Sequence, residues 1–128
     1  MATYNGAQYL QTQIASILKQ LDDCDQLIIV DDQSTDNTID IIRNFKDSRI
    51  QLMINPYNMG AALTFNRALH EAEGDLIFLS DQDDLWHDDK VSTLVDMFST
   101  KDLDLIIHDA LVLRDGMLVH ASLFKMVN

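Results

Sequence analysis

The sequence predicts an α/β fold in which a mainly parallel β-sheet is flanked by helices. Segments with apolar residues at helical spacing alternate along the chain with short, continuous apolar runs, which are typical of buried parallel strands. Two of these runs end in aspartates, at the end of a strand where ligands bind in open parallel sheets. The length of 128 residues fits one domain.

Four elements are expected in the first half of the chain. Apolar residues at spacings of three and four predict an amphipathic helix over residues 8–21. The apolar run 26–30 predicts a buried strand. Helix-starting side chains followed by apolar residues at helical spacing predict a helix over residues 35–45, and a second strand is expected over residues 50–54.

The second half continues the alternation. A helix is expected to open at Asn58-Met59-Gly60 and to end near Gly74. The run 76–79 predicts a strand, residues 87–100 a helix, and residues 105–113 a further strand, with a hairpin turn at Asp115-Gly116. The inner face of the first of these helices is expected to comprise Ala62, Phe65, Leu69 and Ala72.

The composition excludes several classes of protein. An apolar share of 47% with 23% charged residues is that of a globular protein, not of a disordered chain. A net charge of −12 repels phosphate backbones, so nucleic acid is not expected as a partner. Neither a membrane-spanning apolar run nor a signal-peptide pattern is found, which predicts a cytoplasmic location. The single Cys24 permits no internal disulfide.

An Asp-x-Asp motif follows the apolar run 76–79. Asp81, Asp83 and Asp84 place at least two carboxylates within reach of one ion, and hard oxygen ligands with open coordination positions suit Mg²⁺ or Mn²⁺. The alternative is a chance match, because aspartate is common in turns and at helix starts. The strand before the motif, and Trp86 and the helix after it, favour the metal site.

Two further groups of residues are candidates for binding. Asp31 and Asp32 could accept a hydrogen bond from a ribose hydroxyl or a base N–H, or one of them could cap the following turn with Ser34. A histidine on a strand, such as His108, is more often structural than a ligand. The candidates for the acceptor side of a site are Asp84, His108 and Asp109.

Four sequence blocks carry a resemblance to a known family. They are ATYNG at 2–6, VDDQSTDNT at 30–38, the segment from Asn55 through NMG at 58–60 to Asn66, and GD at 74–75 followed by LSDQDDLW at 79–86. In this order and spacing they resemble the inverting family 2 glycosyltransferases. The form DQDD-x-W is most similar to bacterial rhamnosyltransferase-type members that build cell-surface polysaccharide.

The resemblance implies a GT-A fold, which is a three-layer nucleotide-binding α/β sandwich and would be incomplete here. Residues 1–128 would be the nucleotide-sugar-binding portion of a glycosyltransferase domain. The donor would be a UDP- or dTDP-sugar held with Mn²⁺ or Mg²⁺. The sugar would pass, with inversion, to a hydroxyl of a saccharide or lipid-linked saccharide acceptor, and the full-length protein would work at the inner face of the membrane.

The resemblance also implies roles for single residues. Ala2 and Tyr4 match the loop that touches the nucleotide, where Tyr4 would stack on the base. Asp32 matches the acid that hydrogen-bonds the base. Asp81 would face the ribose and the metal's water ligands, and Asp83 would ligate the metal directly.

The sequence departs from the family at both ends. Only Met1 precedes the first block, where family members have a buried strand, and the general base is expected beyond Asn128, so no catalytic residue is assigned. The alternative function is a catalytically inactive nucleotide- or metal-binding module. A receiver domain would need a lysine facing the acids, which Lys101 and Lys125 do not supply. We expect residues 1–3 to form a strand stub and a homodimer to bury the open edge of the sheet.

Overall fold

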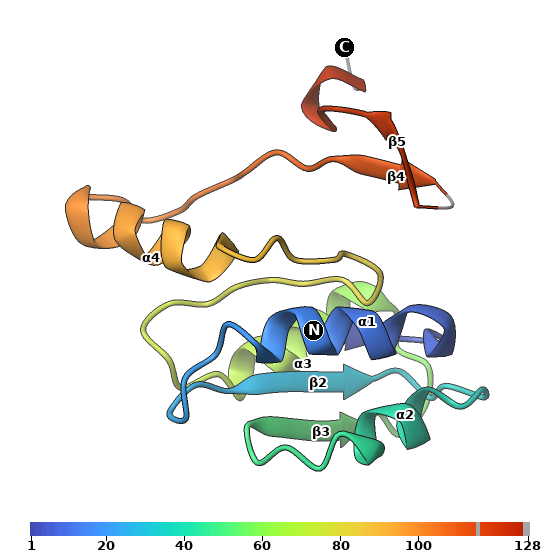
Figure 1. The fold of residues 1–128 in the computed structure, drawn as a ribbon. Coiled ribbons are helices and arrows are strands. Elements are labelled where there is room, and N and C mark those ends of the chain that lie inside the picture. Colours follow the sequence, from blue (N-terminus) through green and yellow to red (C-terminus); the bar gives the residue numbers. More distant parts are fainter. Residues whose placement is uncertain (115, 127–128) are drawn as a thin grey trace. The chain divides into compact units, whose positions relative to one another are not determined.

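The computed structural model describes residues 1–114 and 116–126, and the chain forms two compact units, Met1–Val95 and Asp96–Asn128. Helix α4 (Lys90–Thr100) begins in the first unit and ends in the second. The other elements of the first unit are β1 (Ala2–Thr3), α1 (Ala7–Leu18), β2 (Leu27–Asp31), α2 (Thr38–Asn44), β3 (Ile50–Ile54) and α3 (Ala61–His70) (Figure 1).

The strands of the first unit form a three-stranded parallel sheet in the order β1-β2-β3. Ala2 pairs with Val30, and the pairing of β2 with β3 keeps one register along all five residues of β2. All five residues of β2 are buried, as a central parallel strand requires. The prediction of an α/β fold with a parallel sheet is therefore confirmed, and so is the prediction of a strand stub at residues 1–3.

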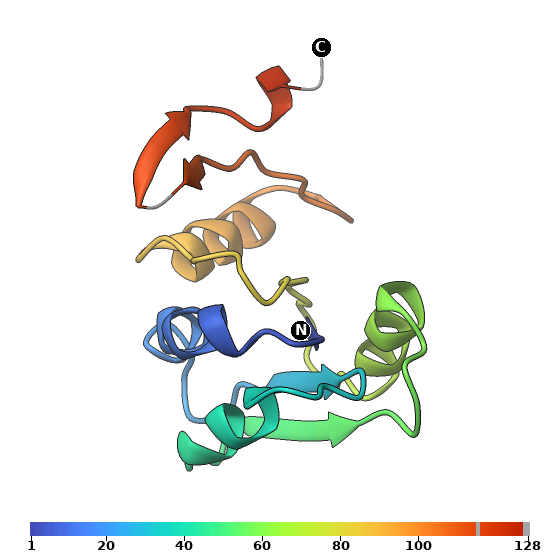
Figure 2. The same ribbon diagram turned by 90° about the vertical axis from the view of Figure 1, so that its right-hand side faces the viewer.

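Helices cover both faces of this sheet (Figure 2). Alternate residues of a strand point to opposite faces, so Leu27 and Ile29 lie on one face and Ile28 and Val30 on the other. The first pair belongs to a cluster with apolar side chains of α1 and α2, and the second pair packs with Ala68 of α3. The result is the three-layer arrangement expected for the nucleotide-binding end of such a sheet.

The early elements agree with the sequence prediction to within a few residues. Helix α1 begins one residue earlier than the predicted helix 8–21 and also ends three residues earlier than predicted. Strand β3 has the predicted bounds. Helix α2 begins only at Thr38, because residues 35–37 form the turn before it. The carboxylate of Asp36 fixes this turn by accepting the N–H groups of Thr38 (3.0 Å) and Ala7 (3.1 Å).

The predicted inner face of α3 was wrong in part. Ala62 and Leu69 are exposed, whereas the buried residues of the helix are Thr64 and Ala68. The prediction used the spacing of apolar residues and therefore missed Thr64, whose side chain is polar. Its hydroxyl donates to the carbonyl of Gly60 (2.9 Å), one turn earlier, and this bond allows the side chain to be buried.

The predicted strand at residues 76–79 was also wrong. The segment pairs with no strand among residues 1–114 and 116–126, and Ile77 and Leu79 are 53% and 62% exposed. Residues 76–79 line a cavity of about 630 Å³ together with Leu27 and Ile28 of β2. An apolar run becomes a strand only where a neighbouring backbone pairs with it, and β1 is only two residues long.

The second unit holds an antiparallel pair, β4 (Val112–Arg114) and β5 (Met117–His120), and a short 3₁₀ helix, η1 (Phe124–Met126). The two strands of the predicted hairpin are confirmed, while Asp115 in its turn lies outside the described residues. The predicted strand 105–113 was wrong except at its end, since residues 105–111 pair with no described strand. In the described part of the chain, no helix has the length and apolar character that crossing a membrane demands.

Candidate functional site

A cavity of about 360 Å³ lies where the carboxyl ends of β1 and β2 meet the loop of residues 80–86, here called the acid loop. Its lining includes all five residues that the sequence placed at a nucleotide sugar, namely Ala2, Tyr4, Asp32, Asp81 and Asp83. The other lining residues are Thr3, Asn58, Gly60, Ala61, Thr64, Phe65 and Gln82. The cavity lies wholly within the first unit, at the edge where a parallel sheet binds its ligands.

Asp31 closes the turn after β2 and does not line the cavity. It is fully buried, and its carboxylate accepts the Ser34 N–H (2.9 Å), the Ser34 hydroxyl (2.5 Å) and the Thr3 hydroxyl (3.0 Å). Of the two alternatives for the aspartate pair, capping of the turn with Ser34 is therefore the one found at Asp31.

Asp32 is 3% exposed and holds the start of α3 in place. Its Oδ1 accepts the side-chain N–H of Asn55 (2.7 Å) and the backbone N–H of Met59 (2.7 Å), and its Oδ2 accepts the N–H of Gly60 (2.8 Å). Burial by itself would raise the pKa of Asp32, but these donors outweigh burial and leave the pKa below its ordinary value. A carboxylate has about four acceptor positions, so one remains for a further donor.

Asn55 connects Asp32 to α3, and sequence reasoning gave it no role. It is 1% exposed and directly follows β3. Besides Asp32, its amide group donates to Thr64 Oγ1 (3.0 Å), and its Oδ1 accepts a hydrogen bond from Arg67 (2.7 Å). The signal in the sequence was the order of a strand, an asparagine, and a glycine that opens a helix, which by itself does not reveal the partners.

The acid loop presents carboxylates that accept no hydrogen bond from residues 1–114 and 116–126. Asp81, Asp83 and Asp84 are exposed, and no described residue donates a hydrogen bond to their side chains. Burial raises the pKa of Asp81, and the charges of Asp84 and Asp83 raise it further. The charges of Asp83 and Asp84 thus disfavour the negative charge of Asp81, and a nearby cation would favour it.

The donor set fits a hard divalent ion only in part. Within residues 1–114 and 116–126, no three His, Cys, Asp or Glu side chains are grouped so that they could hold a metal ion. Mg²⁺ and similar ions are, however, often bound by one or two carboxylates together with phosphate oxygens and water. Asp81 and Asp83, which line the same cavity, fit such a shared site.

Helix α1 anchors both ends of the acid loop. Gln13 is buried and donates to Ser80 Oγ (2.8 Å) and to the carbonyl of Asp81 (3.3 Å). Ser16, one turn later, accepts the backbone N–H of Trp86 (3.1 Å). The anchors therefore act on the two ends of the loop, while its acidic side chains accept no hydrogen bond from the described part of the chain.

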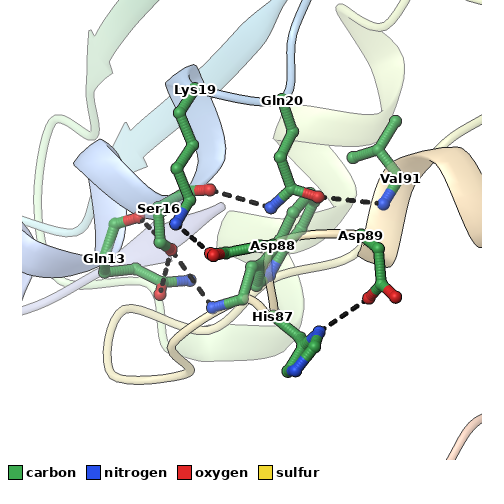
Figure 3. A network of polar contacts seen from close by, with 9 residues as sticks. Gln13, Ser16, Lys19, Gln20, His87, Asp88, Asp89 and Val91 are labelled. Atoms are coloured by element: carbon green, nitrogen blue, oxygen red, sulfur yellow. Dashed lines mark hydrogen bonds and ion pairs between the residues drawn. The ribbon is translucent and has the colours of Figure 1, made fainter.

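The residues that directly follow α1 contact the segment where α4 begins (Figure 3). Gln20 Oε1 accepts the N–H of Val91 (3.1 Å), which satisfies one of the free N–H groups at the start of that helix. Lys19 forms an ion pair with Asp88. Two polar side chains of α1, Gln13 and Ser16, and two that directly follow it, Lys19 and Gln20, thus contact the segment 80–91.

Trp86, the last residue of the acid loop, is buried and packs against Phe78 and Lys90. It is 6% exposed, its ring centroid lies 5.7 Å from that of Phe78, and Lys90 Nζ lies 4.3 Å from its centroid. Burial lowers the pKa of Lys90, while the charge of Asp84 raises it. This packing explains why a tryptophan follows the acidic residues at this spacing.

The three acceptor-side candidates are distributed over both units. Asp84 belongs to the acid loop, whereas His108 and Asp109 belong to the second unit, and both are exposed. The Ser122 hydroxyl and the Phe124 N–H donate to Asp109 and hold its pKa below the ordinary value. His108 Nδ1 lies 2.9 Å from the Asp109 carbonyl oxygen. An acceptor-side role of these residues stays a prediction.

Comparison with known proteins decides the family. The model of the family "Glycosyl transferase family 2" matches residues 1–115 of the 128. The chain belongs to this family. The resemblance that the sequence blocks carried is thereby confirmed.

Two bacterial glycosyltransferases are among the curated relatives of this chain. The Escherichia coli protein UDP-Glc:alpha-D-GlcNAc-diphosphoundecaprenol beta-1,3-glucosyltransferase WfgD is 33% identical over 119 residues, which are 93% of this chain and 47% of the relative. The Shigella flexneri dTDP-rhamnosyl transferase RfbG is 36% identical over 104 residues, which are 75% of this chain and 36% of the relative. The chain thus spans less than half the length of these relatives.

Two solved structures share the fold. S. aureus TarS 1-349 in complex with UDP superposes with a TM-score of 0.72 at 25% identity, over 77% of this chain and 30% of that chain. The mannosyltransferase PcManGT from Pyrobaculum calidifontis, in complex with GDP-Man and Mn²⁺, gives 0.68 at 29% identity, over 73% of this chain and 29% of that chain. The family 2 chain therefore has part of a GT-A fold, as the resemblance implied.

Proposed function

We propose that this family 2 chain is the donor-binding portion of an inverting glycosyltransferase, with a UDP- or dTDP-sugar as donor and Mn²⁺ or Mg²⁺ as cofactor. The observation that carries the proposal is the cavity of about 360 Å³ that Tyr4, Asp32, Asp81 and Asp83 line together. One side of it offers an aromatic ring and a carboxylate acceptor, and the other side offers carboxylates to which no residue of the described chain donates. A nucleoside diphosphate needs both kinds of group at once.

Tyr4 and Asp32 form the base end of the proposed site. The Tyr4 side chain is 46% exposed, so one part of its ring is available for stacking on a base. Asp32 is held by Asn55, Met59 and Gly60, and its remaining acceptor position suits the N3–H that uracil and thymine share. Ala2, beside Tyr4, leaves the nucleotide room to approach the backbone.

Asp83 and Asp81 form the metal end. In the proposal Asp83 binds the ion directly, while Asp81 contacts the ribose and the water ligands of the ion. A bound Mn²⁺ or Mg²⁺ supplies Lewis-acid stabilisation of the diphosphate leaving group. The raised pKa of Asp81 and the absence of described donors to both side chains support this assignment, because a cation relieves the repulsion between the carboxylates.

The remaining functions are proposed for a longer protein. A general base beyond residue 128 activates an acceptor hydroxyl, and one displacement inverts the anomeric carbon. The name of WfgD, which includes GlcNAc-diphosphoundecaprenol, supports a saccharide or lipid-linked saccharide acceptor, and we place this transfer in polysaccharide synthesis. With this acceptor, the enzyme works in the cytoplasm at the inner face of the membrane. A homodimer stays a prediction.

Calorimetry with a series of nucleotides tests the base end. UDP and dTDP should bind in Mn²⁺ with similar affinity, because both bases present an N3–H, and ADP should bind at least about tenfold more weakly. A series in which ADP binds as tightly as UDP would remove Asp32 from base recognition.

The second candidate function is a nucleotide- and metal-binding module without catalysis. It is favoured by the lining of the cavity of about 360 Å³, because none of its described residues is assigned as a general base. A donor-hydrolysis assay on UDP- and dTDP-sugars distinguishes the two functions. Nucleotide binding without any turnover, in a chain extended to the length of its relatives, would favour the module.

A further inference from the structure

Gln82, the middle residue of the Asp-x-Asp motif, makes two hydrogen bonds to the backbone of a single residue, Tyr4. Its Oε1 accepts the Tyr4 N–H (2.9 Å), and its Nε2 donates to the Tyr4 carbonyl oxygen (3.2 Å). Two bonds of this kind are what one strand exchanges with another, so the side-chain amide takes the place of a neighbouring peptide group. Gln82 thereby joins β1 and the residue after it to the acid loop, 78 residues later in the chain.

Gly6 makes room for this contact. A Cβ atom at Gly6 would overlap with Gln82 Oε1 and would lie 2.8 Å from Gln82 Cδ. The backbone of Gly6 has φ −99° and ψ 13°, a conformation with negative φ that alanine also adopts. The missing side chain, and not a glycine-specific backbone angle, is therefore what the position requires. A methyl group at Gly6 would displace the end of the Gln82 side chain and leave the backbone in place.

The contact lies between the two ends of the cavity. Tyr4 is on one side with Asp32, and Gln82 stands between Asp81 and Asp83 on the other, with all five lining the same cavity. The anchors of the acid loop on α1 hold residues 80, 81 and 86. Among the hydrogen bonds of the described residues, those between Gln82 and Tyr4 join the loop to the base end. Neither acidic side chain needs to take part in these bonds.

We propose that Gln82 is a positioning residue that couples the base end of the donor site to its metal end. The inference rests on the proposed function, which places Tyr4 at the base and Asp83 at the ion. A nucleoside diphosphate with its ion spans both ends, so its affinity depends on how well their spacing is fixed before binding, whereas a nucleoside reaches the metal end only through its ribose. Gln82 therefore affects the binding of UDP with Mn²⁺ strongly and the binding of uridine little.

The test compares two ligands on two variants that lose the contact in different ways. Gln82→Ala deletes the amide, and Gly6→Ala displaces it. Each should weaken UDP binding in Mn²⁺ about tenfold and change uridine binding by less than about twofold. Gln11→Ala, at an exposed glutamine of α1, should change neither affinity. Equal losses for UDP and uridine, or no loss for either ligand, would overturn the coupling.

Amide hydrogen exchange without ligand separates the failure of this inference from the failure of the proposed function. The Tyr4 N–H should exchange slowly in the parent chain and at least about tenfold faster in both variants. If the Tyr4 N–H exchanges equally fast in the parent and in both variants, the coupling is refuted whatever the measured affinities for UDP and uridine are. If it is slow in the parent but UDP and uridine both fail to bind, the proposed function is refuted, and the coupling of a donor site falls with it.

Discussion

Asp32 and Asp83 line the same cavity, yet the protein surrounds the two carboxylates in opposite ways. Asp32 is 3% exposed and accepts hydrogen bonds from Asn55, Met59 and Gly60. Asp83 is exposed, and no residue of the described chain donates a hydrogen bond to its side chain. The backbone of its loop is nevertheless anchored on α1 by Gln13.

The difference separates a carboxylate that builds the site from one that is available to a ligand. A buried carboxylate must be satisfied by donors, and Asp32 uses most of its acceptor positions to fix the loop that opens α3. An exposed carboxylate on an anchored backbone keeps its acceptor positions for an ion or for water. The two ends of the cavity should therefore respond differently to mutation, one mainly in stability and the other mainly in binding.

Asp32→Ala should have the largest effect on stability. The substitution leaves the side-chain amide of Asn55 and the N–H groups of Met59 and Gly60 without their acceptor in a partly buried position. We expect the free energy of unfolding to fall by about 3 to 5 kcal/mol, measured by urea denaturation. Asp83→Ala should change it by less than about 0.5 kcal/mol. Similar losses in the two variants would refute the distinction between them.

Tyr4→Ala should have an effect of intermediate size, and this effect should be on the affinity for UDP and not on stability. Removal of an aromatic ring that stacks on a base costs about 1 to 3 kcal/mol of binding free energy, so the affinity for UDP should fall by about fivefold to a hundredfold. The melting temperature should change little, because nearly half of Tyr4 is exposed. Tyr9→Ala is the matched control, since Tyr9 has the same exposed fraction of 46% and lies on α1. Equal affinities of the two variants would exclude stacking by Tyr4.

The smallest of these effects should be on the pH dependence of stability, where Asp32 and Asp81 should differ in sign. The pKa of Asp32 is lowered, so its contribution to stability is present above its ordinary pKa of 3.8 and is lost as the pH falls through its lower folded value. The pKa of Asp81 is raised, so its contribution has the opposite sign and is lost as the pH rises above 3.8. Melting curves from pH 3 to 7 should show a shallower acid limb for Asp32→Asn and a slightly higher melting temperature at pH 7 for Asp81→Asn. Identical pH profiles for the two variants would contradict both assignments.

The sequence predicted the parallel sheet, and it singled out five residues that line one cavity, because both depend on local patterns. The run that became β2 is continuous and apolar, and its residues 27–30 are buried on both faces. The same pattern at residues 76–79 gave a wrong strand, because a strand also requires a partner backbone that the pattern does not contain. Likewise, no local pattern shows that Asp31 satisfies the turn at Ser34 while its neighbour Asp32 reaches Asn55.

The residues that sequence reasoning missed act through contacts between distant segments. Gln13 and Ser16 look like ordinary polar positions of a helix, yet they hold a loop that begins 67 residues later. Gln82 occupies the variable position of the Asp-x-Asp motif, where its chemistry seemed unimportant, but it contacts Tyr4. Such roles depend on the packing of the whole first unit and follow only from its structure.

The most direct test of the account is the dependence of UDP binding on Mn²⁺, measured by calorimetry for the parent chain, Asp83→Ala and Asp40→Ala. Asp40 is an exposed aspartate on α2 and is the matched control. We predict that Mn²⁺ strengthens UDP binding in the parent and in Asp40→Ala, and that Asp83→Ala weakens binding in Mn²⁺ by at least about tenfold, on the scale of one lost charge-assisted contact. Without the metal, all three chains should bind UDP alike. If Asp83→Ala binds UDP in Mn²⁺ as tightly as the parent does, the carboxylate is not a metal ligand and the proposed donor site is wrong.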